Sequence, residues 1–163
     1  MPAIPELFAK YLNPLFIETG AYIGDGINAA LIAGFQHVVS VELSRHFYAT
    51  CCARFENEPR VSLVHGNSAD VLPVILRVVH YPATFWLDAH WSGGDTANTA
   101  PLGAELAALS THAVKTHTLL IDDVGIHNSA ALEAVLRAIN PAYTIAYENG
   151  RVPNDILVAT CKL

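Results

Sequence analysis

Residues 16–31, FIETGAYIGDGINAAL, place a short apolar run before three glycines, at positions 20, 24 and 26, and then a segment rich in alanine and leucine. This order predicts a strand, a tight turn and a helix. Glycine lets the backbone turn sharply and approach a ligand, and the start of a helix offers unpaired N–H groups to a negative group. The spacing is GxxxGxG, which disfavours the GxGxxG turn of dinucleotide sites. A turn that binds nothing is the alternative interpretation.

The same alternation of apolar runs and helical segments continues along the chain and predicts an α/β fold. Strands are expected at 15–18, 37–42, 61–65, 84–88, 118–122, 143–147 and 155–160, and helices at 28–34, 44–56, 69–79, 102–113 and 130–139. The last two strands are joined by ENGRVPND, which is too short for a parallel crossover. We therefore expect a Rossmann-like, doubly wound sheet of seven strands, mostly parallel, with a terminal antiparallel hairpin.

Length and composition limit the classes of protein to consider. The 163 residues suit a single domain spanning 1–163. Apolar residues make up 52% and charged residues 15%, which excludes disorder and favours strands covered on both faces. The net charge of -6 makes a nucleic-acid partner or an anionic membrane surface unfavourable. A surface with so few charges also fits a homodimer.

Other features of the sequence bear on location. The three cysteines have neither disulfide-framework nor paired metal-ligand spacing, which favours a reducing, cytoplasmic setting. The N-terminal sequence MPAIPELFAK lacks the basic start and apolar run of a signal peptide. Prolines and polar residues interrupt the most apolar stretch, 71–87, so no membrane span is expected.

Two acids accompany the glycine turn. Glu42 ends the second predicted strand, 22 residues after Gly20 (42 − 20 = 22), close to the separation of about 20 residues at which an acid binds ribose hydroxyls. An exposed residue or a helix cap is the alternative for Glu42. Glu18, just before the turn, would either hold an ammonium group or accept hydrogen bonds from N–H groups of the turn, and the sequence favours these roles equally.

Small polar residues follow the third predicted strand in VSLVHGNSADVLPVIL, residues 61–76. Asn67, Ser68 and Asp70 have side chains that can hydrogen-bond the edge of an adenine ring. Asn67 or Ser68 can equally cap the helix that follows. Both roles are compatible with each other.

Further acids follow the next two strands, in FWLDAHWSGGD and LLIDDVGIHN. Asp88, Asp122 and Asp123 would meet at the carboxyl ends of parallel strands, where they would supply oxygen ligands to a hard cation such as Mg²⁺. Loop caps or arginine partners are the alternative roles. His90 and His127 flank the acids and are candidate general bases, with His90 favoured by its position.

These segments, in this order, resemble class I S-adenosylmethionine-dependent methyltransferases, and within them the catechol O-methyltransferase and macrocin-type O-methyltransferase groups. ETGAYIGDG resembles their cofactor loop, VEL their ribose acid and VSLVHGNSADVLP their adenine segment. LDAHW and LLIDDV resemble the segments that supply metal ligands. A terminal antiparallel hairpin is also typical of this class.

The resemblance implies an in-line transfer of a methyl group from a sulfonium to an oxygen of a small hydroxylated acceptor, assisted by magnesium. The catalytic residues it implies are His90 and Asp88, and the metal ligands are Asp88, Asp122 and Asp123. The cofactor residues it implies are Glu18, Gly20, Ala21, Tyr22, Gly24, Gly26, Glu42, Leu43, Asn67, Ser68, Ala69 and His90.

Three departures from the catechol-type pattern leave the acceptor open. Ser92 and two glycines follow LDAHW, so the lysine that acts as base in those enzymes has no counterpart. Asp123 stands where those enzymes have asparagine, which is closer to the macrocin-type enzymes. Only 14 residues precede the first predicted strand, so the acceptor pocket is either open or completed by a second subunit. A metal-independent methyltransferase, a non-catalytic cofactor-binding partner and, less favoured, an NAD-dependent oxidoreductase are the alternatives.

Overall fold

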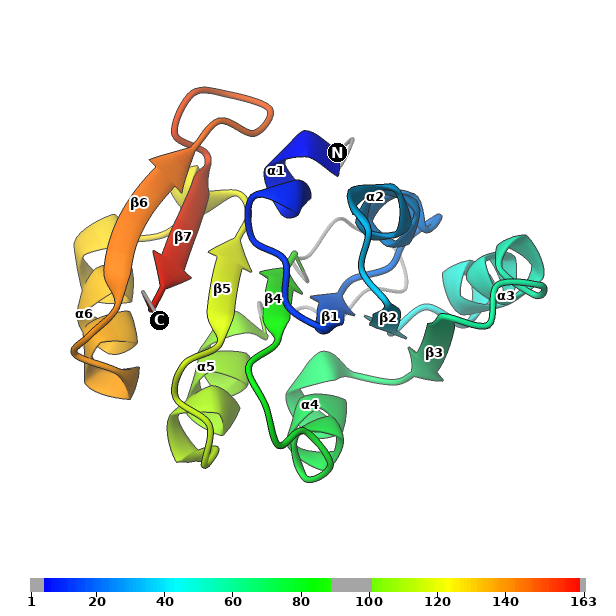
Figure 1. Ribbon diagram of the computed structural model, residues 1–163, viewed down its shortest axis with the longest axis horizontal. Coiled ribbons are helices and arrows are strands. Elements are labelled where there is room, and N and C mark those ends of the chain that lie inside the picture. Colours follow the sequence, from blue (N-terminus) through cyan, green and yellow to red (C-terminus); the bar gives the residue numbers. More distant parts are fainter. Residues whose placement is uncertain (1–4, 89–100, 162–163) are drawn as a thin grey trace.

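A computed structural model describes residues 5–88 and 101–161, and its strands form one seven-stranded sheet in the order β3-β2-β1-β4-β5-β7-β6 (Figure 1). The first five strands along the chain run parallel, and β7 pairs antiparallel with both β5 and β6. The bounds are β1 Leu15–Thr19, β2 His37–Glu42, β3 Val61–His65, β4 Thr84–Leu87, β5 Thr118–Ile121, β6 Thr144–Glu148 and β7 Ile156–Thr160. The predicted Rossmann-like sheet with its antiparallel end is confirmed.

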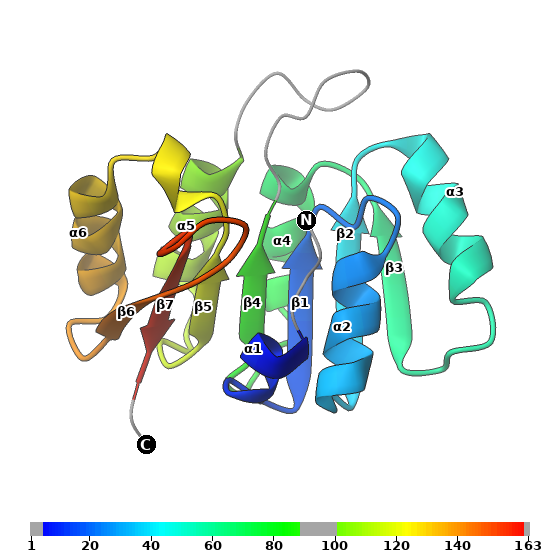
Figure 2. The same ribbon diagram turned by 90° about the horizontal axis from the view of Figure 1, so that it is seen from above.

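Helices cover both faces of the sheet (Figure 2). One layer contains α1 Pro5–Ala9, α2 Asp25–Ala33 and α3 Arg45–Arg54, and the other contains α4 Ser68–Leu76, α5 Leu102–Thr111 and α6 Ser129–Ile139. A short 3-10 helix, η1 Val124–Ile126, follows β5. Within the described residues, no helix is long and apolar enough to cross a membrane.

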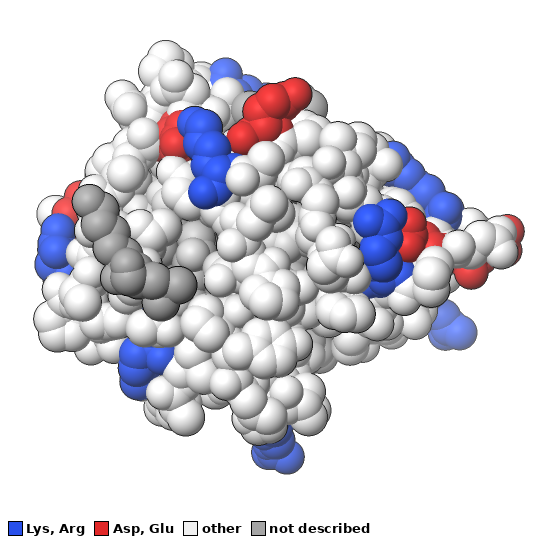
Figure 3. All heavy atoms as spheres, viewed as in Figure 1, with Lys and Arg blue, Asp and Glu red and all other residues white. Residues whose placement is uncertain are grey.

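Each face of the sheet has its own core because neighbouring residues of a strand point to opposite faces. Ile17 packs in the core under α4, α5 and α6, whereas Phe16 packs in the core under α1, α2 and α3. All residues of the central strands β1, β4 and β5 are buried. The edge strand β3 is only partly buried. Most of the surface visible in Figure 3 is uncharged, as the low proportion of charged residues predicts.

The structure corrects several expected boundaries. Helix α1, which the alternation did not predict, begins at Pro5, where the fixed φ of proline suits the first helical position. Helix α2 begins at Asp25, three residues earlier than expected (28 − 25 = 3), because Gly24 has the left-handed conformation and ends the turn there. Helix α4 ends at Leu76 instead of 79. The strand ends agree to within one residue.

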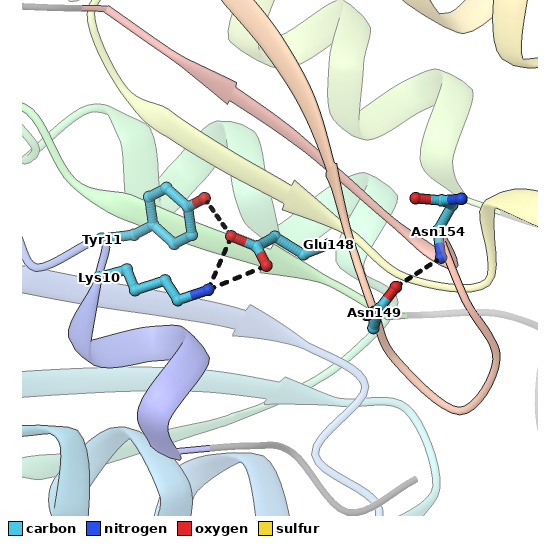
Figure 4. A network of polar contacts seen from close by, with 5 residues as sticks. All are labelled: Lys10, Tyr11, Glu148, Asn149 and Asn154. Carbon is cyan, nitrogen blue, oxygen red and sulfur yellow. Dashed lines mark hydrogen bonds and ion pairs between the residues drawn. The ribbon is translucent and has the colours of Figure 1, made fainter.

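Polar contacts attach the segment before β1 to the far edge of the sheet (Figure 4). Lys10 Nζ and the Tyr11 hydroxyl donate to the carboxylate of Glu148, at 3.0 and 2.8 Å. In the β6–β7 loop, the backbone N–H of Asn154 donates to Asn149 Oδ1 at 3.1 Å (Figure 4). The contacts of Glu148 attach the terminal hairpin to the segment before β1, whereas the Asn154–Asn149 hydrogen bond is internal to the hairpin loop.

Candidate functional site

The carboxyl ends of β1, β2, β4 and β5 meet at one edge of the sheet, the upper edge in Figure 2. The register keeps these ends level, since Thr19 pairs with Val41 on one side and with Leu87 on the other. Leu87 in turn pairs with Ile121. Open parallel sheets bind ligands at this edge, so the segments that follow these strands form the candidate site.

The glycine turn after β1 is held on both sides. The N–H of Gly20 donates to the carbonyl of Val41 at 2.9 Å, which attaches the turn to β2. From α3, Arg54 Nη1 donates to the carbonyl of Ile23 at 2.7 Å and forms an ion pair with Asp25 at 2.8 Å. The turn therefore has a defined path before any ligand is considered.

Glu18 lies under this turn with only 2% of its surface exposed. Its Oε2 accepts a hydrogen bond from Ser40 Oγ at 2.5 Å. Burial raises the pKa of Glu18 to about 8, the Ser40 hydrogen bond opposes that rise, and the nearby charges of Asp88 and Glu42 add to it. A cation beside this carboxyl would lower its pKa and favour the ionised form. Both predicted roles of Glu18 stay predictions.

Glu42 connects the glycine turn to the start of α3. Its Oε2 accepts from the N–H of Tyr22 at 2.8 Å, and its Oε1 accepts from the N–H of Ser44 at 2.7 Å. The capping alternative is therefore present in the structure, because Ser44 is the N-cap of α3. Each carboxylate oxygen has a second lone pair, so a ribose hydroxyl can still bind there. The ribose role stays a prediction.

The polar segment after β3 caps a helix, as its alternative interpretation predicted. Asn67 Oδ1 accepts from the N–H of Ala69 at 3.1 Å, and Ser68 is the first residue of α4. The N–H of Gly66 donates to the carbonyl of Glu42 at 2.9 Å, so this segment lies against the end of β2. Leu43, which follows Glu42, accepts from His65 Nε2 at 3.1 Å through its carbonyl. The predicted adenine residues are thus neighbours of the predicted ribose acid.

The three predicted metal ligands come together. Each of them contributes one carboxylate oxygen, and these three oxygens, from Asp88, Asp122 and Asp123, all lie within 4.8 Å of one another. Asp123 has the left-handed backbone conformation, with φ of 51°, which is uncommon for a residue other than glycine. The sharp bend after β5 therefore directs two consecutive carboxylates toward the end of β4.

Asp122 is the buried member of the three, with 4% of its surface exposed. Burial, and next the charge of Asp88, raise its pKa to about 7. A contact from the N–H of Asp123 offsets the rise only in part, and neither Asp122 oxygen accepts a hydrogen bond of normal geometry from the described residues. Three oxygen donors around such a buried acid fit a hard divalent cation.

The predicted base, His90, lies outside the described part of the chain. Trp91 and the SGGD segment lie outside it as well. His127 follows η1 and is partly exposed, and its N–H donates to the carbonyl of Val124 at 2.9 Å.

Sequence reasoning missed two buried polar residues at this edge, Thr19 and Glu105. Glu105 lies on the face of α5 that also carries Leu102, Leu106 and Leu109, at helical spacings of three and four residues. An acid within such an apolar stripe is a signal of a buried carboxyl, and it is readable from the sequence.

The chain matches no protein-family model and none of the curated proteins. It is similar in structure to TomG, an O-methyltransferase of tomaymycin synthesis from Streptomyces achromogenes in complex with SAM. The TM-score is 0.64 at 15% identity, over 98% of this chain and 78% of that one. An O-methyltransferase from Bacillus cereus in complex with SAH matches with a TM-score of 0.63 at 16% identity, over 97% and 78% of the two chains.

A protein from Clostridium thermocellum that is provisionally assigned as an rRNA methylase is similar over nearly the whole of both chains, 98% of this one and 95% of that one. Its TM-score is 0.65 at 13% identity. Likeness at these identities establishes a common fold, so the chain has the Rossmann-like fold of these methyltransferases. What each of them binds or methylates is a property of that protein.

Proposed function

We propose that the chain is an S-adenosylmethionine-dependent methyltransferase that transfers a methyl group to a hydroxyl of a small acceptor with the help of Mg²⁺. One observation carries the proposal. The glycine turn with its two buried acids and the three-aspartate cluster lie at adjacent strand ends of one sheet edge. The likeness to O-methyltransferases solved with SAM or SAH supports it.

The cofactor would lie across the ends of β1 and β2. Glu18 would face the ammonium group of its methionine part, because a buried carboxyl with a raised pKa gains most from a cation. Glu42 would accept hydrogen bonds from the ribose hydroxyls with the lone pairs that Tyr22 and Ser44 leave unused. Leu43 would pack on the adenine, and the remaining cofactor residues are Gly20, Ala21, Gly24, Gly26, Asn67, Ser68, Ala69 and His90.

Asp88, Asp122 and Asp123 would hold the cation. A bound Mg²⁺ supplies positive charge that lowers the pKa of a hydroxyl and makes it a better nucleophile. The aspartates would orient the acceptor relative to the cofactor, and the buried strand ends would exclude water. Asp88 lies next to both parts of the site, because its N–H donates to the carbonyl of Thr19 at the end of β1. His90 would take the proton of the hydroxyl.

The acceptor class follows from the ligand chemistry and from the three sequence departures. Two adjacent oxygens of a diol or catechol would suit a cation held by three carboxylates. Asp123 in place of asparagine and the missing lysine favour a sugar-like hydroxyl over a catechol.

A reducing, cytoplasmic location and a homodimer stay predictions.

Calorimetry with SAM and SAH, with and without Mg²⁺, tests the proposal. Micromolar binding to the wild type that Glu42→Ala weakens at least tenfold would support it, since a charged hydrogen-bond partner is removed. Glu58→Gln, which changes a surface acid paired with Arg60, is the matched control. No binding of either ligand under any condition would overturn the proposal.

Two further assays separate the alternatives. Turnover of phenol and sugar acceptors that persists with a chelator would indicate a metal-independent methyltransferase. Tight cofactor binding without turnover on any acceptor class would indicate a non-catalytic partner. Titration with NAD tests the oxidoreductase alternative, and an rRNA fragment among the acceptors tests the activity assigned to the Clostridium thermocellum neighbour.

A further inference from the structure

One side of α3 contacts the glycine turn that joins β1 to α2. The contacts come from Phe47, Cys51 and Arg54, which are four and three residues apart, and from Phe55, which directly follows the helix. Residues at these spacings lie on the same side of a helix. The turn is therefore held by α3 as well as by β2.

The uncharged contacts of this side fix the middle of the turn. The ring centroids of Tyr22 and Phe47 are 4.4 Å apart, and Cys51 Sγ donates to the carbonyl of Tyr22 at 3.2 Å. A β-carbon on Gly24 would lie 2.5 Å from Cε2 of Phe55, so the ring fits closely against the bare glycine.

Arg54 supplies a charged contact. A single nitrogen, Nη1, donates to the carbonyl of Ile23 at 2.7 Å and to Asp25 Oδ1 at 2.8 Å. The guanidinium also lies over the ring of Phe55, with Cζ 5.3 Å from the centroid. Ile23 belongs to the turn and Asp25 begins α2, so one side chain connects α3 to both. Hydrogen bonds from a charged donor are stronger than neutral ones, so this contact is the strongest of the set.

The turn needs such support because Tyr22 has a left-handed backbone, with φ of 49°. That conformation costs free energy in a residue other than glycine, and it persists only where the surrounding contacts hold it. In this conformation the N–H of Tyr22 donates to Glu42 at 2.8 Å. A turn released from α3 would relax into other conformations. The apparent affinity for a ligand at the turn would then fall with the fraction of molecules that keep the binding conformation.

We propose that Arg54 is a positioning residue that holds the glycine turn in the conformation that receives the amino-acid part of the cofactor. The inference rests on the proposed function, in which the methionine part lies at the turn beside Glu18. Arg54 itself does not touch the ligand, and it acts through Ile23 and Asp25.

Two ligands that differ in the amino-acid part test this role. S-adenosylhomocysteine carries that part, and 5′-methylthioadenosine has the same adenine, ribose and sulfur with a methyl group in its place. Calorimetry, by displacement where binding is weak, should give at least tenfold tighter binding of S-adenosylhomocysteine to the wild type. Arg54→Met keeps an apolar stem beside Phe55 and removes the donors. The ratio of the two affinities should fall about threefold to tenfold in this variant.

Arg60→Met is the matched control. The Arg60 side chain is 40% exposed, against 37% for Arg54, and it pairs with an acid, Glu58, at 2.7 Å. This variant should keep the wild-type ratio. Arg54→Lys should recover part of the lost ratio, because one nitrogen makes both contacts of Arg54 and an ammonium group has enough hydrogens to donate to both acceptors.

The outcomes separate this inference from the proposed function. If the wild type binds S-adenosylhomocysteine but Arg54→Met keeps the wild-type ratio, or if the wild-type ratio is near one, the role of Arg54 is wrong and the methyltransferase proposal stands. If the wild type binds neither ligand, both proposals fail. A merely structural role of Arg54 would lower the urea midpoint of Arg54→Met and weaken both ligands equally, with no change in the ratio.

A double-mutant cycle tests the connection to α2. Asp25→Asn should also weaken S-adenosylhomocysteine binding. The double variant with Arg54→Met should bind no more weakly than Arg54→Met alone, because the same contact is already lost. Fully additive losses would show that Arg54 and Asp25 act independently, and would overturn the inference.

Discussion

The carboxyl group of Glu18 lies against Gly26, at the start of α2, so closely that a β-carbon on Gly26 would be 1.7 Å from Oε1. The backbone of Gly26 is otherwise ordinary for a helix, so the requirement for glycine comes from this contact. Gly26, the third glycine of the turn, therefore provides space for the carboxyl of Glu18, which precedes the first glycine. The two residues act as a unit.

Gly26→Ala should disrupt this unit. The added carbon forces the Glu18 carboxyl out of its buried place and away from Ser40, so we expect unfolding to become easier by about 1–3 kcal/mol, the usual range for overpacking. SAH affinity should fall at least tenfold. Urea unfolding and calorimetry measure the two effects. Gly103→Ala, in α5, is the control, since a β-carbon there meets nothing within 4 Å. Equal behaviour of the two variants would contradict the role of the contact.

Asp122→Asn should stabilise the metal-free protein and abolish its response to Mg²⁺. The raised pKa of about 7 means that the folded protein binds this proton more tightly than the unfolded chain does. Stability from this group is therefore complete below the unfolded pKa near 4 and is lost as the pH rises through about 7. An asparagine at this position has no proton to lose, so the variant does not lose stability in this way. The difference in free energy of unfolding between the Asp122→Asn variant and the wild type should therefore grow between pH 5 and pH 8.

The measurement is chemical unfolding across this pH range, together with thermal unfolding with and without Mg²⁺. The wild-type midpoint should rise with Mg²⁺, because a ligand that binds only the folded state stabilises it. Asp70→Asn, an exposed change in the first turn of α4, should keep the Mg²⁺ response. A wild-type midpoint that ignores millimolar Mg²⁺ would count against the three-aspartate site.

The sheet could be predicted from the sequence because burial on both faces leaves a strong local signal. Phe16 and Ile17 face different cores, so apolar residues occur in continuous runs whose ends are easy to place. The three aspartates could also be identified, since Asp88 and Asp122 each follow such a run directly and Asp123 comes next to Asp122. Helix α1 was missed because its five residues, which begin with Pro5, carry too short a pattern to be recognised.

The partners of the acids could not be predicted in the same way. Glu42 accepts from Tyr22, which is 20 residues away, and this pairing depends on how the glycine turn folds back over β2. The pattern indicates that an acid belongs at the end of β2, but a ribose acid and a structural brace have the same residue type at the same place. Only the contacts distinguish these roles. The Glu42 carboxylate accepts from two backbone N–H groups, as a brace would, and keeps lone pairs that can accept from ribose hydroxyls.

His117→Gln tests a contact between buried His117 and partly exposed His112 at the opposite edge of the sheet. His117 Nδ1 accepts from the N–H of Ala83 at 3.1 Å, so in the neutral ring Nε2 carries the hydrogen. That nitrogen lies 2.9 Å from His112 Nδ1, and His112 Nε2 lies 3.0 Å from the carbonyl of Val79. The chain of hydrogen bonds is complete only when both rings are neutral.

Burial, with the charges of His112 and Lys115, lowers the pKa of His117 to about 4. The unfolded chain therefore takes up the proton first, so stability from this group is complete above about pH 6.5 and is lost as the pH falls toward 4. In urea unfolding, the wild type should lose stability over this range relative to His117→Gln. The variant itself should be less stable at pH 8 by about 1–3 kcal/mol, because the N–H of Ala83 loses its partner. His80→Gln, an exposed change, should follow the wild type at every pH, and the same pH slope in both variants would contradict the assignment.

Glu18 should release a proton when the cofactor binds. Its pKa of about 8 leaves it largely protonated at pH 7, and an ammonium group beside it would stabilise the ionised form. Calorimetry of SAH binding at pH 7 without Mg²⁺, in buffers of different ionisation enthalpy, measures this proton directly, and we expect a release approaching one proton per ligand. Glu18→Gln should bind more weakly and release none, while Glu58→Gln should match the wild type. Tight binding without proton release would mean that Glu18 only supports the turn, because a carboxyl that stays protonated against Ser40 can hold Gly26 in place but offers a cation no charge.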